Sequence, residues 1–87
     1  MKHRDTTVIC WEILRALAGG PQLPTRLSRV ANVPYDRFGE YVQVLISGGL
    51  VKVDSSEEHE RYAITPQGME ALHHLDTGLR MLFPAMW

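Results

Sequence analysis

The sequence predicts a mainly helical α+β domain in which three helices are followed by a β-hairpin and a further helix. Three observations support this class. Apolar residues recur at three- and four-residue steps in four segments. Proline and glycine separate these segments, and two short strand-like runs lie between the third and the fourth. The 87 residues are expected to form a single domain, 1–87, with one small core.

The first helix is expected to begin at Asp5 or Thr6, whose side-chain oxygens can cap the free amides of its first turn. Its apolar residues share one face: Ile9, Cys10, Ile13, Leu14 and Leu17. The helix ends at 19–21, Gly-Gly-Pro. Trp11 falls on the opposite side, where it either wraps the edge of the core or belongs to an interface. Cys10 is the single cysteine, so neither a disulfide framework nor a cysteine zinc cluster is predicted.

A second helix is expected to begin near Pro24 or Thr25 and to end at about Ala31. Three of its residues are predicted to face inward: Leu27, Val30 and Ala31. Three are predicted to face outward: Arg26, Ser28 and Arg29. Residues 32–34, Asn-Val-Pro, form the turn, because the residue before a proline is disfavoured in helical geometry.

Pro34 is well placed to open the third helix, and 48–49, Gly-Gly, ends it. Its inward stripe consists of Phe38, Tyr41, Val42, Leu45 and Ile46. Its outer face consists of Tyr35, Asp36, Arg37, Gly39, Glu40 and Gln43. The helix therefore presents a mainly polar surface on an apolar base.

Two strand-like runs, 50–54 and 61–64, flank the polar segment Ser-Ser-Glu-Glu-His-Glu and predict a β-hairpin. Thr65 and Pro66 then open the last helix as its N-cap and first residue. Its stripe continues to the end of the helix through Met69, Leu72, Leu75, Leu79, Leu82 and Phe83, after which Pro84 stops it.

Two helices joined by a short turn and followed by a hairpin form the winged helix-turn-helix arrangement. Four features carry the resemblance in order: Ala31-Asn32, Phe38 with Tyr41, Gly49-Leu50-Val51, and Thr65 to Gly68. In these features the chain resembles the small archaeal winged-helix proteins regarded as transcriptional regulators. Those proteins are relatives of dimeric archaeal chromatin proteins and, more distantly, of MarR and PadR repressors. The resemblance extends over residues 8–75, and the same fold also serves as a protein-interaction module.

The resemblance implies that the third helix enters the major groove of double-stranded DNA, where its early outward residues meet base edges. These are Tyr35, Asp36, Arg37, Glu40 and Gln43. Arg37 can read guanine, Gln43 can read adenine, and a carboxylate can accept from the cytosine amino group. Phosphate contacts are expected from the supporting helix and the wing strands, at Thr25, Arg26, Arg29, Lys52 and Arg61. The alternative for these residues is an ordinary solvated surface.

The expected wing is acidic. Glu57, Glu58 and Glu60 argue against its insertion into a minor groove, whose potential is strongly negative. The wing is therefore either held away from DNA or contacts another protein. The net charge of −1 favours neither possibility.

The C-terminal segment, 79–87, is richer in large apolar side chains than so small a domain can easily bury. We therefore predict that 66–83 is a dimerisation helix, which packs with the first helix against their copies around a two-fold axis. The resemblance also implies a C-terminal dimerisation helix. The expected interface residues are Trp11, Leu75, Leu79, Leu82, Phe83, Met86 and Trp87. Two-fold symmetry implies a palindromic target, whereas a tail folded over its own domain is the alternative.

No catalytic constellation can be recognised, so no enzyme activity, cofactor or small-molecule substrate is predicted. His73 and His74 are adjacent and point about 100° apart on a helix, which disfavours a shared metal. Glu70 and His59 complete no ligand set with them, so no metal site is expected. The sequence contains neither a long apolar run nor a secretory signal, so a cytoplasmic protein that does not contact membranes is expected. The sequence thus favours a homodimeric DNA-binding regulator or nucleoid protein, and the alternative is a winged-helix interaction module.

Overall fold

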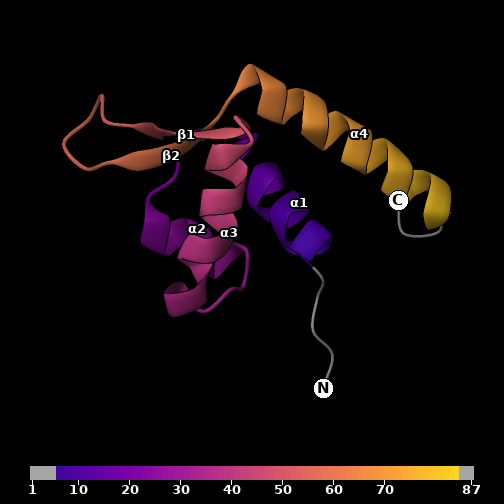
Figure 1. Ribbon diagram of the computed structural model, residues 1–87, viewed down its shortest axis with the longest axis horizontal. Coiled ribbons are helices and arrows are strands. Elements are labelled where there is room, and N and C mark those ends of the chain that lie inside the picture. Colours follow the sequence, from indigo (N-terminus) through magenta and orange to yellow (C-terminus); the bar gives the residue numbers. More distant parts are fainter. Residues whose placement is uncertain (1–5, 85–87) are drawn as a thin grey trace.

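The computed structural model describes residues 6–84, whose helices and strands follow the predicted order. The elements are α1 (Thr6–Leu17), α2 (Pro24–Val30), α3 (Tyr35–Ser47), β1 (Val51–Asp54), β2 (Arg61–Ile64) and α4 (Pro66–Leu82). Helices α1, α2 and α3 pack together, while the hairpin and α4 project from them in different directions (Figure 1). The predicted α+β class and its winged helix-turn-helix arrangement are confirmed.

The core lies where α1, α2 and α3 meet. Its most deeply buried side chains, each less than 2% exposed, are Ile13, Leu14, Leu17, Leu27, Val42 and Val51. The predicted inward stripes of α1 and α3 are therefore confirmed, with Cys10, Tyr41 and Ile46 at the partly buried margin. Burying side chains of this size removes about 1.5–3 kcal/mol of unfavourable hydration each, which makes this cluster the main stabilising element.

Helix α2 differs from the prediction on both of its flanks. Ser28 was expected to face outward but is buried. Its hydroxyl donates a hydrogen bond to the carbonyl oxygen of Thr25 at 2.9 Å, so this buried polar group has a partner. Val30 was expected inside but is 56% exposed and lines a shallow groove with residues of α1. Only Leu27 and Ala31, one turn apart, bury their side chains as predicted. A helix of seven residues has a narrow buried face, and that face is rotated toward Ser28.

The hairpin pairs Val51 with Ile64 and Val53 with Tyr62 in antiparallel register. Directly paired residues share a face, so these four side chains lie on the side where Tyr62 meets the core. The other edge of β2 is bridged by Gln22, whose amide and carbonyl both bond to Tyr62 at 3.0 and 2.9 Å. This bridge was not predicted. It ties the segment before α2 to the hairpin.

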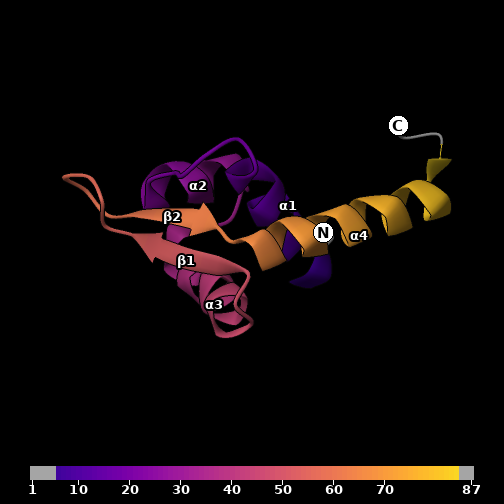
Figure 2. The ribbon, with the colours of Figure 1, turned by 90° about the horizontal axis from the view of Figure 1, so that it is seen from above.

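Helix α4 begins as predicted, because Thr65 is its N-cap and the amide of Gly68 donates to the Thr65 hydroxyl at 2.9 Å. Its first half contacts α1, and Leu72 is buried there. Its C-terminal turns extend past the rest of the molecule (Figure 2). There Met81, Leu82 and Phe83 are 78%, 71% and 50% exposed. The apolar stripe of α4 thus continues beyond the surface that its own domain can cover.

The predicted interface residues Met86 and Trp87 and the predicted cap Asp5 lie outside the described residues. Within residues 6–84, no helix has the length and apolar character needed to cross a membrane.

Candidate nucleic-acid interface

The turn between α2 and α3 is fixed by its backbone. Asn32 has a φ of 58°, in the left-handed region that asparagine tolerates better than most residues. The amide of Val33 then donates to the carbonyl oxygen of Ser28 at 3.0 Å. Ala31 is fully buried, and its small side chain allows the two helices to approach at this point. The angle between α2 and α3 is therefore set by the turn and by close packing.

An aromatic stack fixes α3 against the hairpin. Phe38 is buried, and its ring centroid lies 6.3 Å from that of Tyr35 and 6.2 Å from that of Tyr62. Tyr35 stacks nearly parallel to Phe38, whereas Tyr62 is tilted by 55°. These distances are within the range of favourable ring pairs. The N-terminal half of α3 is thereby held by contacts with both its own first turn and β2.

The outward face of α3 is exposed along its length. All five residues expected to meet bases lie on this surface: Tyr35, Asp36, Arg37, Glu40 and Gln43. The guanidinium of Arg37 donates through Nη2 to the hydroxyl of Tyr41 at 3.3 Å, one turn further along the helix. This single bond directs the side chain along α3 and uses one of the five N–H donors of the guanidinium.

The predicted outer face of α3 omits Val44 and Ser47, which are both exposed. Val44 is 57% exposed and lies one helical turn after Glu40. The four-residue spacing was a usable signal, but an apolar residue in an amphipathic helix is normally assigned to the core. Exposed beside polar neighbours, Val44 offers the kind of apolar contact that a thymine methyl group accepts.

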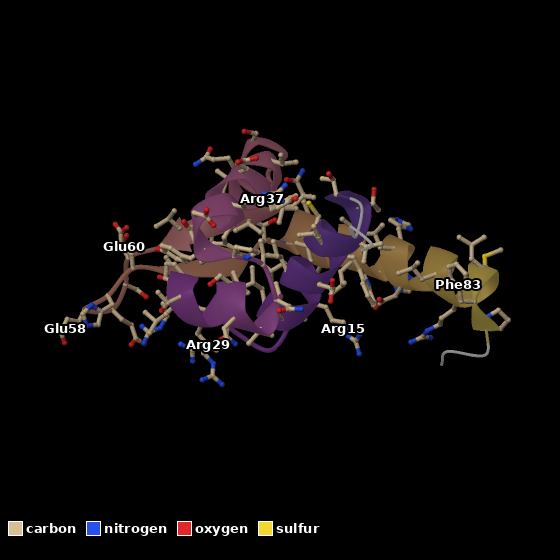
Figure 3. The ribbon with its side chains drawn as sticks, turned by 90° about the horizontal axis from the view of Figure 1, so that it is seen from below. Arg15, Arg29, Arg37, Glu58, Glu60 and Phe83 are labelled. Atoms are coloured by element: carbon tan, nitrogen blue, oxygen red, sulfur yellow. The ribbon has the colours of Figure 1, made fainter. Side chains whose placement is uncertain are left out.

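Helix α2 contributes the basic side of the region. Thr25, Arg26 and Arg29 are exposed, as predicted. Arg29 and Arg15 of α1 extend from one side of the molecule, and Arg37 lies on the other side (Figure 3). The structure therefore gives α2 and α3 separate charged surfaces, and the basic side chains of α2 flank α3 instead of sharing its face.

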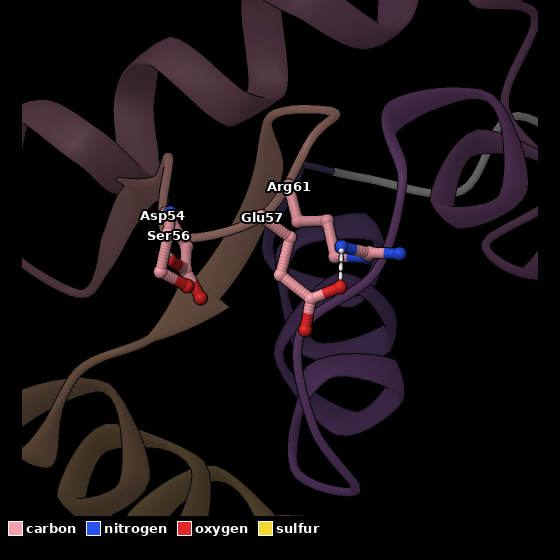
Figure 4. Close-up of polar contacts among 4 residues, drawn as sticks. All are labelled: Asp54, Ser56, Glu57 and Arg61. Carbon is pink, nitrogen blue, oxygen red and sulfur yellow. Dashed lines mark hydrogen bonds and ion pairs between the residues drawn. The ribbon is translucent and has the colours of Figure 1, made fainter.

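The wing consists of β1, β2 and the connecting residues 55–60. Lys52 is exposed on β1, whereas Arg61 on β2 is half-buried and forms an ion pair with Glu57, Nη1 to Oε1, at 2.9 Å (Figure 4). Glu58 and Glu60 lie at the far end of the hairpin (Figure 3). One of the two predicted phosphate contacts in the wing is thus already engaged by a carboxylate of the wing itself.

The connecting loop is ordered by local hydrogen bonds. The amide of Ser56 donates to Oδ1 of Asp54 at 3.0 Å, and Figure 4 shows these two residues side by side. The hydroxyl of Ser55 donates to Glu60 at 3.3 Å. Hydrogen bonds from the Ser56 side chain and backbone lower the pKa of Asp54, because they favour its charged form. Asp54 therefore keeps its negative charge to a lower pH than an isolated aspartate would.

Trp11 is engaged within its own chain. Its indole Nε1 donates to Oδ1 of Asp76 on α4 at 2.6 Å, and the guanidinium of Arg15 lies 5.1 Å from its ring centroid. Of the two alternatives that the sequence left open, this contact corresponds to Trp11 at the edge of the core of its own domain. Nearby, burial raises the pKa of the Cys10 thiol.

Comparisons with known proteins agree with this geometry. A winged helix-turn-helix family model matches residues 3–82. An uncharacterized protein of Methanocaldococcus jannaschii is 32% identical over 65 residues, which cover 75% of this chain and 63% of that protein. The chain thus spans less than two thirds of that relative.

Three solved structures share the fold. The transcriptional regulator BldR of Sulfolobus solfataricus is 27% identical, with a TM-score of 0.79 over 90% of this chain and 58% of BldR. Sso10a-2, a DNA-binding protein of the same organism, is 23% identical, with a TM-score of 0.79 over 95% of this chain and 90% of its own. The homodimeric winged helix-turn-helix DNA-binding domain Mb0332 of Mycobacterium bovis is 22% identical, with a TM-score of 0.67 over 86% and 71%.

Proposed function

This chain belongs to the winged helix-turn-helix family, and from this premise we propose that it is a homodimeric DNA-binding protein, a transcriptional regulator or nucleoid protein, that inserts α3 into the major groove. The observation that carries the proposal is the contrast between the two faces of α3. The inner face is fixed by the buried Phe38, and the outer face is polar and exposed. A rigid helix with a free polar face is what direct readout of base edges requires.

Base selection is assigned to Arg37, Gln43 and the carboxylates of Asp36 and Glu40. Arg37 donates to guanine O6 and N7, and Gln43 makes a paired contact with adenine. The carboxylates accept from the cytosine amino group, and they repel the phosphate backbone when the register is wrong. This face provides sequence preference and little affinity, because its own charges are one positive and two negative.

Affinity is assigned to the phosphate contacts beside α3. Arg26 and Arg29 on α2 reach the backbone at the rim of the groove, with Thr25 as a neutral donor and Lys52 as a wing contact. Arg61 contributes less than the other cations, because Glu57 already neutralises it. With so few cations per subunit, useful affinity requires two copies on one duplex, which favours a palindromic site.

The apolar end of α4 supports dimerisation. Leu82 and Phe83 are exposed and continue the stripe that buries Leu72 in the first half of the helix. Pairing of this end, with Leu75 and Leu79 at its margin, removes an apolar patch from water in a closed two-fold arrangement. The homodimeric state of the Mycobacterium bovis domain of the same fold agrees with this assembly.

A second function is favoured by the wing. Its charged residues are two cations, Lys52 and Arg61, against four carboxylates, which is unsuited to a minor groove. If α3 does not bind DNA, the acidic wing and the apolar end of α4 are the surfaces of a protein-interaction module.

Equilibrium binding to duplex DNA over a range of salt concentrations separates the two functions. A DNA-binding protein loses affinity steeply as salt rises, because counterions are released from each neutralised phosphate. Replacing Arg26 and Arg29 by Glu should abolish binding and leave the dimer intact in sedimentation. Arg80→Glu on α4 is the charge-reversal control and should retain binding. Absence of duplex binding by the unmodified protein at low salt would leave the interaction module as the function.

A further inference from the structure

We propose that Asp76 is a positioning residue that fixes the direction of α4 relative to α3, and so sets the separation of the two DNA half-sites. The first part concerns a single chain and needs neither DNA nor a partner subunit. The second part rests on the dimeric DNA-binding function proposed above.

The N-terminal end of α4 is attached to the chain that leaves α3. The hydroxyl of Thr65 donates to the carbonyl oxygen of Gly49 at 2.6 Å, and the amide of Thr65 donates to that of Leu50 at 3.0 Å. Gly68 lies against Leu50 so closely that a Cβ at this position would overlap the Leu50 carbonyl oxygen. Gly49, with a φ of 76°, supplies the backbone conformation that this approach needs. We call these four residues the joint.

The joint holds α4 at its N-terminal end, and Leu72 packs against the core about two turns after Thr65. Apolar packing alone has little directional preference, whereas a hydrogen bond further along the helix restricts its tilt. That bond runs from Trp11 to Asp76 at 2.6 Å, and we call it the strut. Asp76 lies eleven residues after Thr65, or about 16 Å further along the axis of α4.

The strut is a strong contact for its size. A hydrogen bond to a carboxylate is shorter and roughly twice as strong as a neutral one. Trp11 and Asp76 are both half-buried, so water competes less for the bond than it would at the surface. Arg15 lies over the indole ring at 5.1 Å, which keeps the ring from turning away.

Because the strut lies just before the exposed end of α4, it affects how the two subunits of a dimer are oriented. Beyond Asp76, α4 leaves its own domain and presents Met81, Leu82 and Phe83 to solvent (Figure 2). A partner held at this end is connected to α3 only through α4. The longest dimension of the molecule is 42 Å, and half of it serves as an approximate distance between the end of α4 and α3. A tilt of about 10° over roughly 20 Å moves α3 by about 3.5 Å, which equals one base-pair step.

Distances within one chain test the first part directly. Spin labels at Gln43→Cys on α3 and Arg80→Cys on α4, in a Cys10→Ala background and diluted with excess unlabelled protein, report the intrachain distance by pulsed electron resonance. We expect a narrow distribution for the parent protein and for Asp76→Asn, which keeps an acceptor oxygen. Asp76→Leu and Trp11→Phe should each broaden it, while circular dichroism shows that they remain folded.

The same narrow distribution in Asp76→Leu and Trp11→Phe would overturn the proposal, because α4 would then be held without the strut. Broadening in Asp76→Asn equal to that in Asp76→Leu would also overturn it, since the acceptor oxygen would not be the feature that matters. Trp11→Phe removes the indole N–H but keeps an aromatic ring and leaves the Asp76 carboxylate in place, so it decides the question if Asp76→Leu fails to fold.

Binding to duplexes with half-sites at different separations tests the second part. The parent protein and Asp76→Asn should prefer one separation by about tenfold over its neighbours, whereas Asp76→Leu should bind neighbouring separations within about threefold of one another. An unchanged preference in Asp76→Leu would overturn the link between the strut and half-site separation. If the parent protein binds no duplex at all, the proposed function fails, and the intrachain distances still decide the role of Asp76.

Discussion

Helix α3 and the wing are the two elements that this fold can present to DNA, and here they are built in opposite ways. The polar face of α3 is supported from behind by Phe38, which contacts rings on both α3 and β2. The wing has no such support at its tip, and its loop is held by hydrogen bonds and by the ion pair of Glu57 with Arg61. The helix carries exposed donors and acceptors, whereas the wing carries a net excess of carboxylates.

Under the proposed function, this difference assigns base selection to α3 and most of the affinity to other elements. A rigid face can hold Arg37 and Gln43 at fixed distances from base edges, which specificity requires. Under the proposed function, a wing with an excess of carboxylates adds little phosphate attraction beyond Lys52, so most of that attraction is assigned to α2 and to dimerisation. Substitutions confined to one region at a time test the separate roles of α3 and the wing.

The largest effect is expected from Phe38→Ala. Replacing a buried phenylalanine by alanine lowers the free energy of unfolding by about 3–5 kcal/mol, because the transfer free energy of the ring is lost and a cavity is left in the core. Tyr35 and Tyr62 would lose the ring between them, so α3 would lose its attachment to β2. Chemical denaturation measures the change. Tyr35→Ala, at the exposed end of the stack, should lower the free energy of unfolding by about 1 kcal/mol. Equal losses of stability in the two variants would show that Phe38 is not the main support of the stack.

Replacement of Arg37 by Ala should act on binding and spare the fold. The side chain is exposed, and its internal hydrogen bond is a long one of 3.3 Å to Tyr41. Loss of a base-reading arginine costs about 1–3 kcal/mol of binding free energy at its preferred base and relaxes the preference there. Competition binding with single-base variants of the selected site measures both effects. Tyr41→Phe removes the internal bond alone and should leave the base preference in place.

The wing should respond in the opposite direction. Replacing Glu57 by Gln frees Arg61 from its ion pair and removes one negative charge. Affinity for duplex DNA should rise by about two- to fivefold at low salt, with no change in base preference, because exposed charges interact weakly and are screened. Glu70→Gln on α4 is the charge-matched control. A fall in affinity for the Glu57 variant would mean that the ion pair itself presents the wing to DNA.

The smallest effect is expected from the titration of Asp54. Hydrogen bonds from Ser56 lower the pKa of Asp54, so the charged form is favoured in the folded protein. The stabilising contribution is complete above the ordinary aspartate pKa of about 4 and is lost as the pH falls below the lowered folded value. The amide resonance of Ser56 should therefore shift with a midpoint below about 4. A midpoint above this value would mean that the hydrogen bond of 3.0 Å does not form in solution.

Much of the fold could be predicted because its signals are local. The stripes of α1 and α3, the cap at Thr65 and the glycine turn at Gly49 each depend on a few neighbouring residues, and the structure confirms them. The buried face of helix α2 was harder to predict, because a helix of seven residues has too few apolar positions to decide whether Ser28 or Val30 faces the core. The buried serine is tolerated because the carbonyl oxygen of Thr25 accepts a hydrogen bond from its hydroxyl, which composition cannot reveal.

The long-range contacts could not be predicted from local patterns. Trp11 and Asp76 are 65 residues apart, and nothing in either neighbourhood indicates the other. The bridge between Gln22 and Tyr62 is hidden for the same reason. For the candidate site, helical spacing correctly placed the outward residues of α3 on the surface. It left Val44 unassigned, because an apolar residue type gives no signal for an exposed position. The roles of these residues toward DNA remain predictions.

The proposed function requires that DNA contacts the outward face of α3 and not the tip of the wing. Titration of the isotope-labelled protein with a duplex at low salt, followed through backbone amide resonances, tests this most directly. We expect shifts to concentrate at residues 24–29 and 34–44, with residues 55–60 unchanged. Shifts confined to the wing or to the exposed end of α4, with α3 unaffected, would contradict it.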